Sequence, residues 1–241
     1  MTALLSLDRI SKRFRGLVAV DGVTFDVPDG VIFAVIGPNG AGKTTLFNMI
    51  AGAMTPDEGT IIFAGTPLTG LTPDAVCRRG IARTFQLVRP FPALSVEDNV
   101  TIGALLHRHD VGAARERAQT LLRRFELFDR RDQLASSLTL PDRKRLEVVR
   151  ALATEPKLLL LDEVMAGLRP TETDRMVATL REINRESGLT ILLIEHVMRA
   201  VMALASRVLV LDHGMAIAEG APQDVVRDPA VIQSYLGAEA V

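Results

Sequence analysis

The segment from residue 37 to residue 45 constrains the fold of this chain more than any other. It reads Gly-Pro-Asn-Gly-Ala-Gly-Lys-Thr-Thr, which matches the pattern of a P-loop, a glycine-rich loop that binds phosphates. An almost wholly apolar run at residues 31–36 precedes it, as is typical of a parallel strand buried on both faces. Residues 45–52 follow with helical spacing and a terminal glycine. Because strand, loop and helix come in this order, the sequence predicts a P-loop within an α/β fold.

A P-loop holds a nucleotide through its backbone and through two side chains. Its glycines let successive N–H groups point at an anion, and the dipole of the following helix adds favourable charge. Lys43 is expected to reach the β- and γ-phosphates, and the Thr44 hydroxyl is expected to ligate Mg²⁺. The residues predicted to bind the phosphates are Gly37, Pro38, Asn39, Gly40, Ala41, Gly42, Lys43, Thr44 and Thr45.

Composition excludes several classes of protein. Lys and Arg number 28 and Asp and Glu 29, so a net charge of −1 gives no general field for nucleic acid. The chain has no Trp and one Tyr, which argues against base-stacking platforms. The single cysteine, Cys77, excludes an intrachain disulfide and fits a reducing compartment. Residues 189–211 are strongly apolar but are interrupted by ionisable side chains, so we expect any membrane role to come through a partner.

Strand and helix patterns alternate along most of the chain. Strands are expected at residues 4–11, 18–27, 31–36, 60–64, 83–85, 158–161, 190–194 and 207–211. Between residues 95 and 137, apolar residues recur at three- and four-residue intervals among many arginines, which predicts an all-helical insertion of about forty residues. This alternation implies a mostly parallel sheet with helices on both faces.

An acidic pair follows one of the predicted strands. Four leucines at residues 158–161 lead into Asp162 and Glu163. A buried strand that ends there presents both carboxylates at the C-terminal edge of a parallel sheet, where α/β proteins bind ligands. Asp162 is expected to hold Mg²⁺ through water, and Glu163 is expected to polarise the attacking water as a general base.

These motifs, in this order, resemble the ATP-binding subunits of ABC transporters, and the resemblance runs from end to end. It implies an ABC-type P-loop core with an antiparallel β subdomain and an inserted helical subdomain, which binds ATP and Mg²⁺. It also implies that Phe14 stacks on adenine and that Gln86 contacts Mg²⁺ and the attacking water. In the same family, the histidine that aligns with His196 contacts the γ-phosphate and orients the water. The other histidines, which match no motif, are His107, His109 and His213.

Four segments look more specifically like the branched-chain amino-acid importers, namely residues 83–91, 142–147, 193–196 and 228–237. Related urea and amide importers share much of this pattern. The resemblance implies a second ABC ATPase subunit, identical or different, and two integral-membrane permease subunits. A periplasmic or extracytoplasmic solute-binding protein is an indirect partner, and nucleic acid is not expected as one. The chain is then a peripheral subunit at the cytoplasmic face of the cell membrane.

The signature segment departs from the family pattern. The usual Leu-Ser-Gly-Gly-Gln aligns with residues 138–142, Leu-Thr-Leu-Pro-Asp, and its role is to close over the ATP of the partner subunit. Thr139 keeps the hydroxyl expected to contact that ATP. However, Pro141 has no N–H, and Leu140 is bulky where glycine allows close approach. The same residues also form a good helix start, with Thr139 as N-cap and Asp142 as a capping-box acid.

Two further departures follow the predicted catalytic glutamate. Val164 replaces the proline that usually comes next, and Arg169 stands where the family generally carries Asp or Asn. The loop that ends at Arg169 crosses the dimer interface in the family, so a cation there is expected to change its hydrogen bonding.

The sequence therefore predicts one ABC ATPase domain over residues 1–241. Residues 1–86 and 154–241 are expected to form the nucleotide-binding core and β subdomain, and residues 87–153 the helical subdomain with the signature segment. The predicted function is ATP hydrolysis that drives uptake of branched-chain or other hydrophobic amino acids. The alternatives are a nucleotide-dependent clamp that hydrolyses poorly because its own signature is altered, and the ATPase of a urea or amide importer.

The segment after Gln86 is expected to contact a membrane subunit, because it is too apolar for an ordinary solvated loop. With the helical subdomain it is predicted to form a groove for a short cytoplasmic helix of that subunit. The alternative is that these side chains pack on their own helical subdomain. The apolar residues concerned are Leu87, Val88, Pro90, Phe91 and Pro92.

Overall fold

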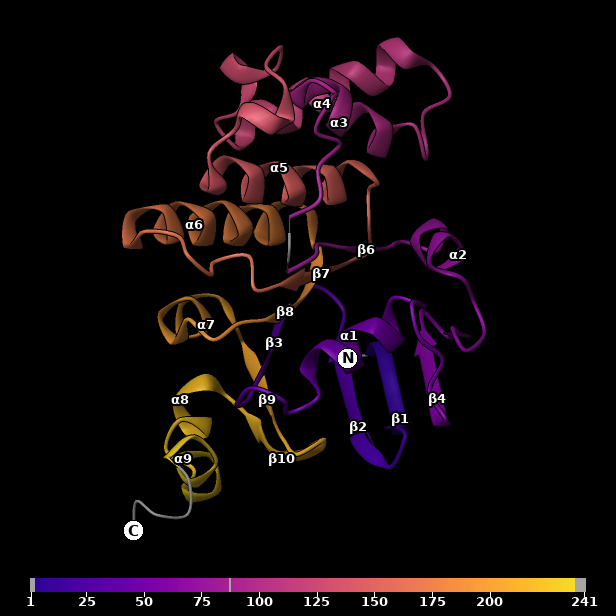
Figure 1. Cartoon of the computed structure of the whole chain (residues 1–241), viewed down its shortest axis with the longest axis vertical. Helices are drawn as coiled ribbons and strands as arrows, with labels where there is room; N and C mark the ends of the chain where they lie inside the picture. The colour runs from indigo at the N-terminus through magenta and orange to yellow at the C-terminus, as the bar shows by residue number, and fades with distance from the viewer. Residues whose placement is uncertain (1–2, 87, 237–241) are drawn as a thin grey trace.

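The computed structural model describes residues 3–86 and 88–236 and shows two sheets with helices around them (Figure 1). Leu87 and the last residue of the 228–237 segment therefore lie outside the described residues. The central sheet has six strands in the order β10-β9-β3-β8-β7-β6, and the second sheet has four in the order β2-β1-β4-β5. The predicted α/β fold with a mostly parallel sheet and an antiparallel β subdomain is confirmed.

The strands of the central sheet are β3 (Ile32–Ile36), β6 (Ile81–Arg83), β7 (Leu158–Asp162), β8 (Thr190–Ile194), β9 (Arg207–Asp212) and β10 (Met215–Gly220). Neighbouring strands from β9 to β6 pair in parallel, and β10 pairs antiparallel with β9. The second sheet contains β1 (Ala3–Phe14), β2 (Leu17–Pro28), β4 (Glu58–Phe63) and β5 (Thr66–Pro67).

The helices are α1 (Lys43–Ile50), α2 (Pro73–Arg78), α3 (Val96–Ala104), α4 (Val111–Arg124), α5 (Leu140–Ala153), α6 (Pro170–Ser187), α7 (Met198–Leu204), α8 (Pro222–Val225) and α9 (Pro229–Leu236). Two short 3₁₀ helices, η1 (Phe128–Arg130) and η2 (Ala135–Ser137), lie between α4 and α5. Within the described chain, no helix is both long and apolar enough to cross a membrane.

Strand β3 divides the interior into two cores. Ile32, Ala34 and Ile36 belong to the core that is shared with α3 to α7. Phe33 and Val35 belong to a second core, which is shared with α1 and the antiparallel sheet. Burial on both faces explains why the strands of the central sheet read as continuous apolar runs. Helix α1, which begins in the P-loop, is thereby held between the two sheets (Figure 1).

The predicted helical insertion, residues 95–137, contains α3, α4 and the two 3₁₀ helices, which lie with α5 at one end of the molecule in Figure 1. Its helices begin at polar N-caps, as the pattern indicates. The Ser95 hydroxyl accepts the Asp98 N–H at 3.0 Å, and the Asp110 carboxylate accepts the Ala113 N–H at 2.7 Å. These caps satisfy N–H groups that a helix leaves unpaired at its start.

Two strands were missing from the sequence prediction. Strand β5 spans two residues, and β10 is an edge strand whose side chains are mostly exposed or half-buried. An edge strand with little burial has no strong alternation of apolar and polar residues, so the period-two signal is weak.

Candidate nucleotide-binding site

The C-terminal ends of the parallel strands meet at one edge of the central sheet. Strand β3 leads into the P-loop, and β7, two positions away in the sheet, ends at Asp162 immediately before Glu163. Strand β8 lies between them and is followed by His196, while β6 leads to Gln86 and β9 to His213. Open parallel sheets bind ligands at this edge, so the strand order assembles side chains that are distant in sequence.

A cavity of about 480 Å³ opens over the P-loop, which is within the usual size range of ligand pockets. Of the predicted site residues outside the loop, Phe14, Gln86 and Glu163 line it. Phe14, at the end of β1, is 41% exposed, so one face of its ring is available for stacking. The lining is formed by Phe14, Leu17, Val18, Ala19, Asn39, Gly40, Ala41, Gly42, Lys43, Thr44, Thr45, Gln86, Glu163 and His213.

The P-loop backbone has positions that no side chain would fit. Gly42 has φ +97°, and a Cβ on it would lie 2.3 Å from the carbonyl oxygen of Ala19. A Cβ on Gly37 would lie 2.0 Å from the carbonyl oxygen of Leu211. These glycines are therefore required by close approach of the backbone as well as by the phosphate-binding pattern.

The Lys43 ammonium is folded into the loop. Its Nζ donates to the carbonyl oxygens of Gly37 and Pro38, both at 2.8 Å. Burial lowers the pKa of Lys43, while the carboxylates of Glu163 and Asp162 act in the opposite direction. The loop therefore holds a cation at its centre, close enough to Glu163 and Asp162 for their charges to stabilise it.

Asp162 lies beneath the cavity and has one free oxygen. The side chain is 1% exposed, and its Oδ2 accepts a hydrogen bond from Arg83 at 2.9 Å. Its Oδ1 is buried without a partner among the described residues. Burial raises the pKa of Asp162, and the bond from Arg83 acts against this rise. Together with the Thr44 hydroxyl in the cavity wall, the free oxygen fits the all-oxygen ligands that Mg²⁺ prefers.

The Glu163 carboxylate lies next to the other two predicted catalytic residues, Gln86 and His196. Its Oε2 accepts a hydrogen bond from Gln86 Nε2 at 2.8 Å and lies 3.9 Å from Nδ1 of His196. The Glu163 side chain is 18% exposed and lines the cavity, whereas His196, whose side chain is 57% exposed, lies next to Glu163 but outside the lining. The arrangement suits a carboxylate that accepts a proton from water held nearby.

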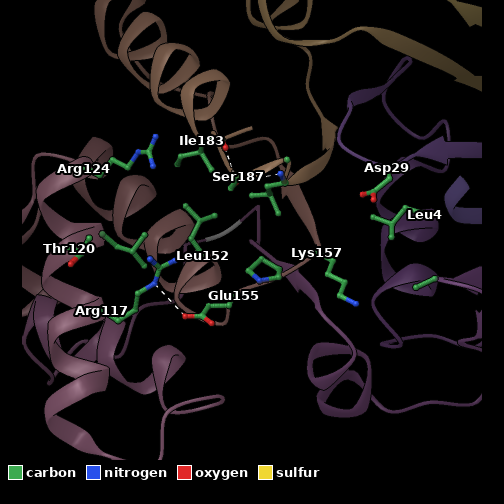
Figure 2. Close-up of a pocket in the computed structure, with 15 residues that line it drawn as sticks. Leu4, Asp29, Arg117, Thr120, Arg124, Leu152, Glu155, Lys157, Ile183 and Ser187 are labelled. Carbon is green, nitrogen blue, oxygen red and sulfur yellow. Dashed lines mark hydrogen bonds and ion pairs between the residues drawn. The ribbon is translucent and has the colours of Figure 1, made fainter. Parts of the chain in front are cut away.

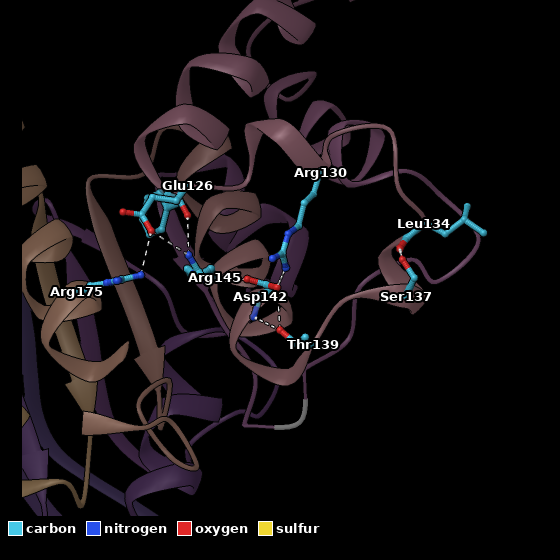
Figure 3. A network of polar contacts seen from close by, with 9 residues as sticks. Glu126, Arg130, Leu134, Ser137, Thr139, Asp142, Arg145 and Arg175 are labelled. Carbon is cyan, nitrogen blue, oxygen red and sulfur yellow. Dashed lines mark hydrogen bonds and ion pairs between the residues drawn. The ribbon is translucent and has the colours of Figure 1, made fainter. Parts of the chain in front are cut away.

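Thr139 lies apart from this cavity, at the start of α5. Its hydroxyl donates to Asp142 Oδ2 at 2.8 Å and accepts the Asp142 N–H at 3.4 Å, which confirms the predicted helix start (Figure 3). Asp142 is buried and also binds Arg130 and Arg145. The predicted contact of Thr139 is with a partner's nucleotide, so its distance from this chain's own P-loop is expected.

A second cavity, of about 710 Å³, lies at the opposite edge of the sheet, next to the residues just before β3, β7 and β8 (Figure 2). Its two lining arginines are paired within the chain, whereas Lys157, which also lines it, has no ion pair among the described residues. Arg117 lies 3.6 Å from Glu155, and Arg124 lies 2.6 Å from Glu186. Because it has neither a glycine loop nor an unpaired acidic pair, we assign the nucleotide to the P-loop cavity.

Besides the apolar lining residues 17–19, three polar residues near the site were not predicted from the sequence. Arg83 pairs with Asp162, His213 lines the cavity, and Tyr235 of α9 lies beside the backbone of Gly37. Burial raises the pKa of the Tyr235 hydroxyl, and a hydrogen bond with the Gly37 backbone opposes this. The available signal for His213 was its place directly after a predicted strand of the parallel sheet.

Comparisons with known proteins agree with this geometry. The sequence pattern described as ABC transporter matches residues 20–166, and a pattern described as branched-chain amino acid ATP-binding cassette transporter matches residues 217–241. The chain is 38% identical to the high-affinity branched-chain amino acid transport ATP-binding protein LivG of Escherichia coli K12, over 97% of this chain and 98% of that protein. It is 36% identical to the lipopolysaccharide export system ATP-binding protein LptB of the same strain, over 98% of each.

Solved structures show the same fold. A nucleotide-free ATP-binding cassette from an ABC transporter superposes with a TM-score of 0.89 at 31% identity, over 98% of this chain and 100% of that one. An ATP-binding cassette in its ADP conformation gives 0.88 at the same identity and coverage. The architecture that brings the P-loop and the acidic pair together is thus shared with known nucleotide-binding cassettes.

Proposed function

The chain belongs to the ABC transporter family, and we propose that it is the ATP-hydrolysing subunit of an importer for branched-chain or other hydrophobic amino acids. The observation that carries hydrolysis is the contact of Gln86 with Glu163 in the wall of the P-loop cavity. The match of residues 217–241 to the branched-chain pattern, together with the likeness to LivG, supports the solute class.

In the proposed mechanism the P-loop residues 37–45 hold the phosphates of ATP, and Phe14 stacks on the adenine. Glu163 accepts the proton of the attacking water, while Gln86 and His196, which both lie near the same carboxylate oxygen, orient that water. Thr44, Gln86 and Asp162 would hold Mg²⁺. The ion would neutralise charge on the phosphates as the terminal bond breaks.

The proposed assembly has two ABC ATPase subunits, identical or different, with two ATP molecules between them. The P-loop of each faces the signature segment of the other, so Thr139 contacts the partner's ATP. Closure of the two ATPase subunits over ATP moves two permease subunits. This chain is then a peripheral subunit on the cytoplasmic face of the membrane. A solute-binding protein acts indirectly, through the permeases. Residues 87–153 would move as the helical subdomain against residues 1–86 and 154–241.

Transport by the assembled complex tests the solute class. Co-purified subunits reconstituted in proteoliposomes with the solute-binding protein are expected to show ATP-dependent uptake of labelled leucine. Uptake should disappear with Glu163→Gln in this chain. Uptake of labelled urea or acetamide in place of leucine would contradict the amino-acid assignment and leave the ATPase assignment standing.

A groove of about 540 Å³ between the core and the helical subdomain supports the proposed contact with the permease. Phe85, Phe91 and Ile102 line it and are each 44–49% exposed, which leaves apolar surface uncovered at this seam. Val88 is half-buried and lines a small pocket between residues of the core, such as Glu163, and residues of α5, such as Glu147. Among the described members of the apolar set predicted for this contact, Phe91 lines the groove, which supports the proposal.

We predict that single cysteines in the groove cross-link to the permease. Phe91→Cys and Ile102→Cys, each in a Cys77→Ser background because Cys77 also lines the groove, are expected to form disulfides with cysteines in the permease's cytoplasmic helices. Val111→Cys is the matched control, since Val111 is 54% exposed and lies on α4 outside the groove. Cross-linking from position 111 alone would contradict the groove assignment.

A further inference from the structure

A buried lysine of α5, the helix that begins in the signature segment, binds the backbone of Glu163, the predicted catalytic base. Lys144 is 6% exposed, and its Nζ donates to the carbonyl oxygen of Glu163 at 2.9 Å. Burial lowers the pKa of Lys144, and the nearby carboxylates of Glu195, Glu163 and Glu147 oppose this. Burial of an ammonium group costs free energy, so packing alone does not explain why a lysine stands at this position. Its bond to the Glu163 carbonyl oxygen suggests a specific role.

Glu163 has a backbone conformation that requires support. Its φ is +50°, in the left-handed region that residues with a side chain seldom adopt. Its N–H donates to the carbonyl oxygen of Ile194 at 2.9 Å. Its carbonyl oxygen accepts the bond from Lys144 at 2.9 Å and a longer one from the N–H of Ala166 at 3.2 Å. The next residue is Val164, so the restriction that a following proline would impose is absent. Hydrogen bonds from β8 and α5 therefore fix this residue.

The same face of α5 also holds the segment that carries Gln86. Glu147, one turn after Lys144, accepts the N–H of Phe85 at 2.7 Å and that of Arg89 at 3.3 Å. Helix α5 thus contacts the backbone on both sides of Gln86 and the backbone of Glu163. These are the two residues whose side chains meet in the cavity.

We infer that Lys144 is a positioning residue that fixes the carboxylate of Glu163 by holding its carbonyl group to α5. This inference rests on the proposed function, in which Glu163 is the general base. Since α5 begins at the signature segment, closure of that segment over the partner's ATP is transmitted to Glu163 of this chain's own site. Helix α5 then acts on both ATP sites of the dimer: it acts on the partner's ATP through Thr139 and on the Glu163 of its own chain through Lys144.

The test is a comparison of Lys144→Met with Lys144→Arg in the assembled transporter. Lys144→Met keeps the length of the side chain but removes the donor, and we expect kcat to fall about tenfold, because small misplacements of catalytic groups are costly. KM for ATP and the affinity for a fluorescent ATP analogue should stay unchanged. Lys144→Arg, which keeps a charged donor, should recover part of the lost kcat. Lys157→Met, at an exposed lysine just before β7, should behave as wild type.

A double-mutant cycle separates this inference from the proposed function. In a Glu163→Gln background, Lys144→Met should cause no further loss in single-turnover hydrolysis, because the group that it positions is already absent. Independent losses from the two substitutions would overturn the inference, as would equal falls in kcat and in ATP affinity. If Glu163→Gln itself had no effect, the proposed function would fail. A wild-type rate for Lys144→Met beside an inactive Glu163→Gln would overturn the positioning role alone.

Discussion

Replacement of Glu163 by glutamine is expected to lower ATP hydrolysis by roughly 10²–10⁴-fold, which is the usual contribution of a general base. Glutamine has nearly the same shape but cannot take a proton from water at neutral pH. The Lys43 ammonium donates to carbonyl oxygens of the P-loop and not to the Glu163 carboxylate, so the substitution leaves the hydrogen bonds of the loop in place. Binding of ATP should therefore survive the loss of turnover.

Lys43→Ala is expected to give the opposite pattern. The ammonium lies at the centre of the P-loop, where it would make charge-assisted contacts with the phosphates. Its removal should weaken ATP binding first, and turnover only as a consequence. The pair of variants thus separates holding the nucleotide from hydrolysing it.

Phosphate release by the assembled transporter and titration with a fluorescent ATP analogue measure the two effects. Glu116→Gln, at an exposed glutamate of α4, is the matched control and should leave both unchanged. A wild-type rate for Glu163→Gln would refute its assignment as the base. Loss of ATP affinity in Glu163→Gln would instead assign Glu163 to binding.

The fold was predictable because its strongest signals are local. The P-loop follows directly on a strand and opens a helix, so residues 31–52 specify a β-α unit without help from the rest of the chain. The runs that became β7 and β8 are apolar throughout because both of their faces are buried. The edge strand β10 has no such burial, and its pattern was too weak to predict.

The position of the acidic pair, Asp162 and Glu163, was predictable from the sequence, but the buried polar groups behind it were not. Asp162 and Glu163 follow a run of four leucines, a pattern that predicts a buried strand ending at the ligand-binding edge of a parallel sheet. Lys144 has no comparable signal, since a lysine in a helix of mixed charge is usually exposed. Its burial depends on where α5 packs against the loop after β7, which strand order and helix packing decide.

The signature segment shows how a prediction of local structure also bears on function. Thr139 caps α5 as predicted, and Asp142 is the residue that it binds. The Asp142 N–H is therefore occupied by Thr139, and Pro141 has no N–H to offer. The arginines at positions 130 and 145 hold the Asp142 carboxylate in this position (Figure 3). Compared with a glycine-rich signature, this helix start has fewer donors for a phosphate.

We therefore predict that the two ATP sites of a heterodimer turn over at different rates. The site on this chain's P-loop keeps its own catalytic residues and needs an intact signature from the partner. The partner's site receives the altered signature of this chain. Loss of one hydrogen bond to a charged group costs about 1.5–3 kcal/mol, which corresponds to a roughly ten- to hundredfold weaker contact. A homodimer would carry this defect at both sites.

Removing one catalytic glutamate at a time gives the rate of each site in the wild-type heterodimer. Leu140→Gly with Pro141→Gly should raise hydrolysis at the partner's site and change this chain's site little, because the glycines restore an N–H and close approach of the backbone. Leu134→Gly, at a similarly exposed leucine of η2's N-cap, is the control for loss of a surface side chain. Equal single-site rates in the wild type would show that the Leu140 N–H and the Thr139 hydroxyl compensate for the proline. In that case, the altered signature would differ from the usual one in sequence but not in its contact with phosphate.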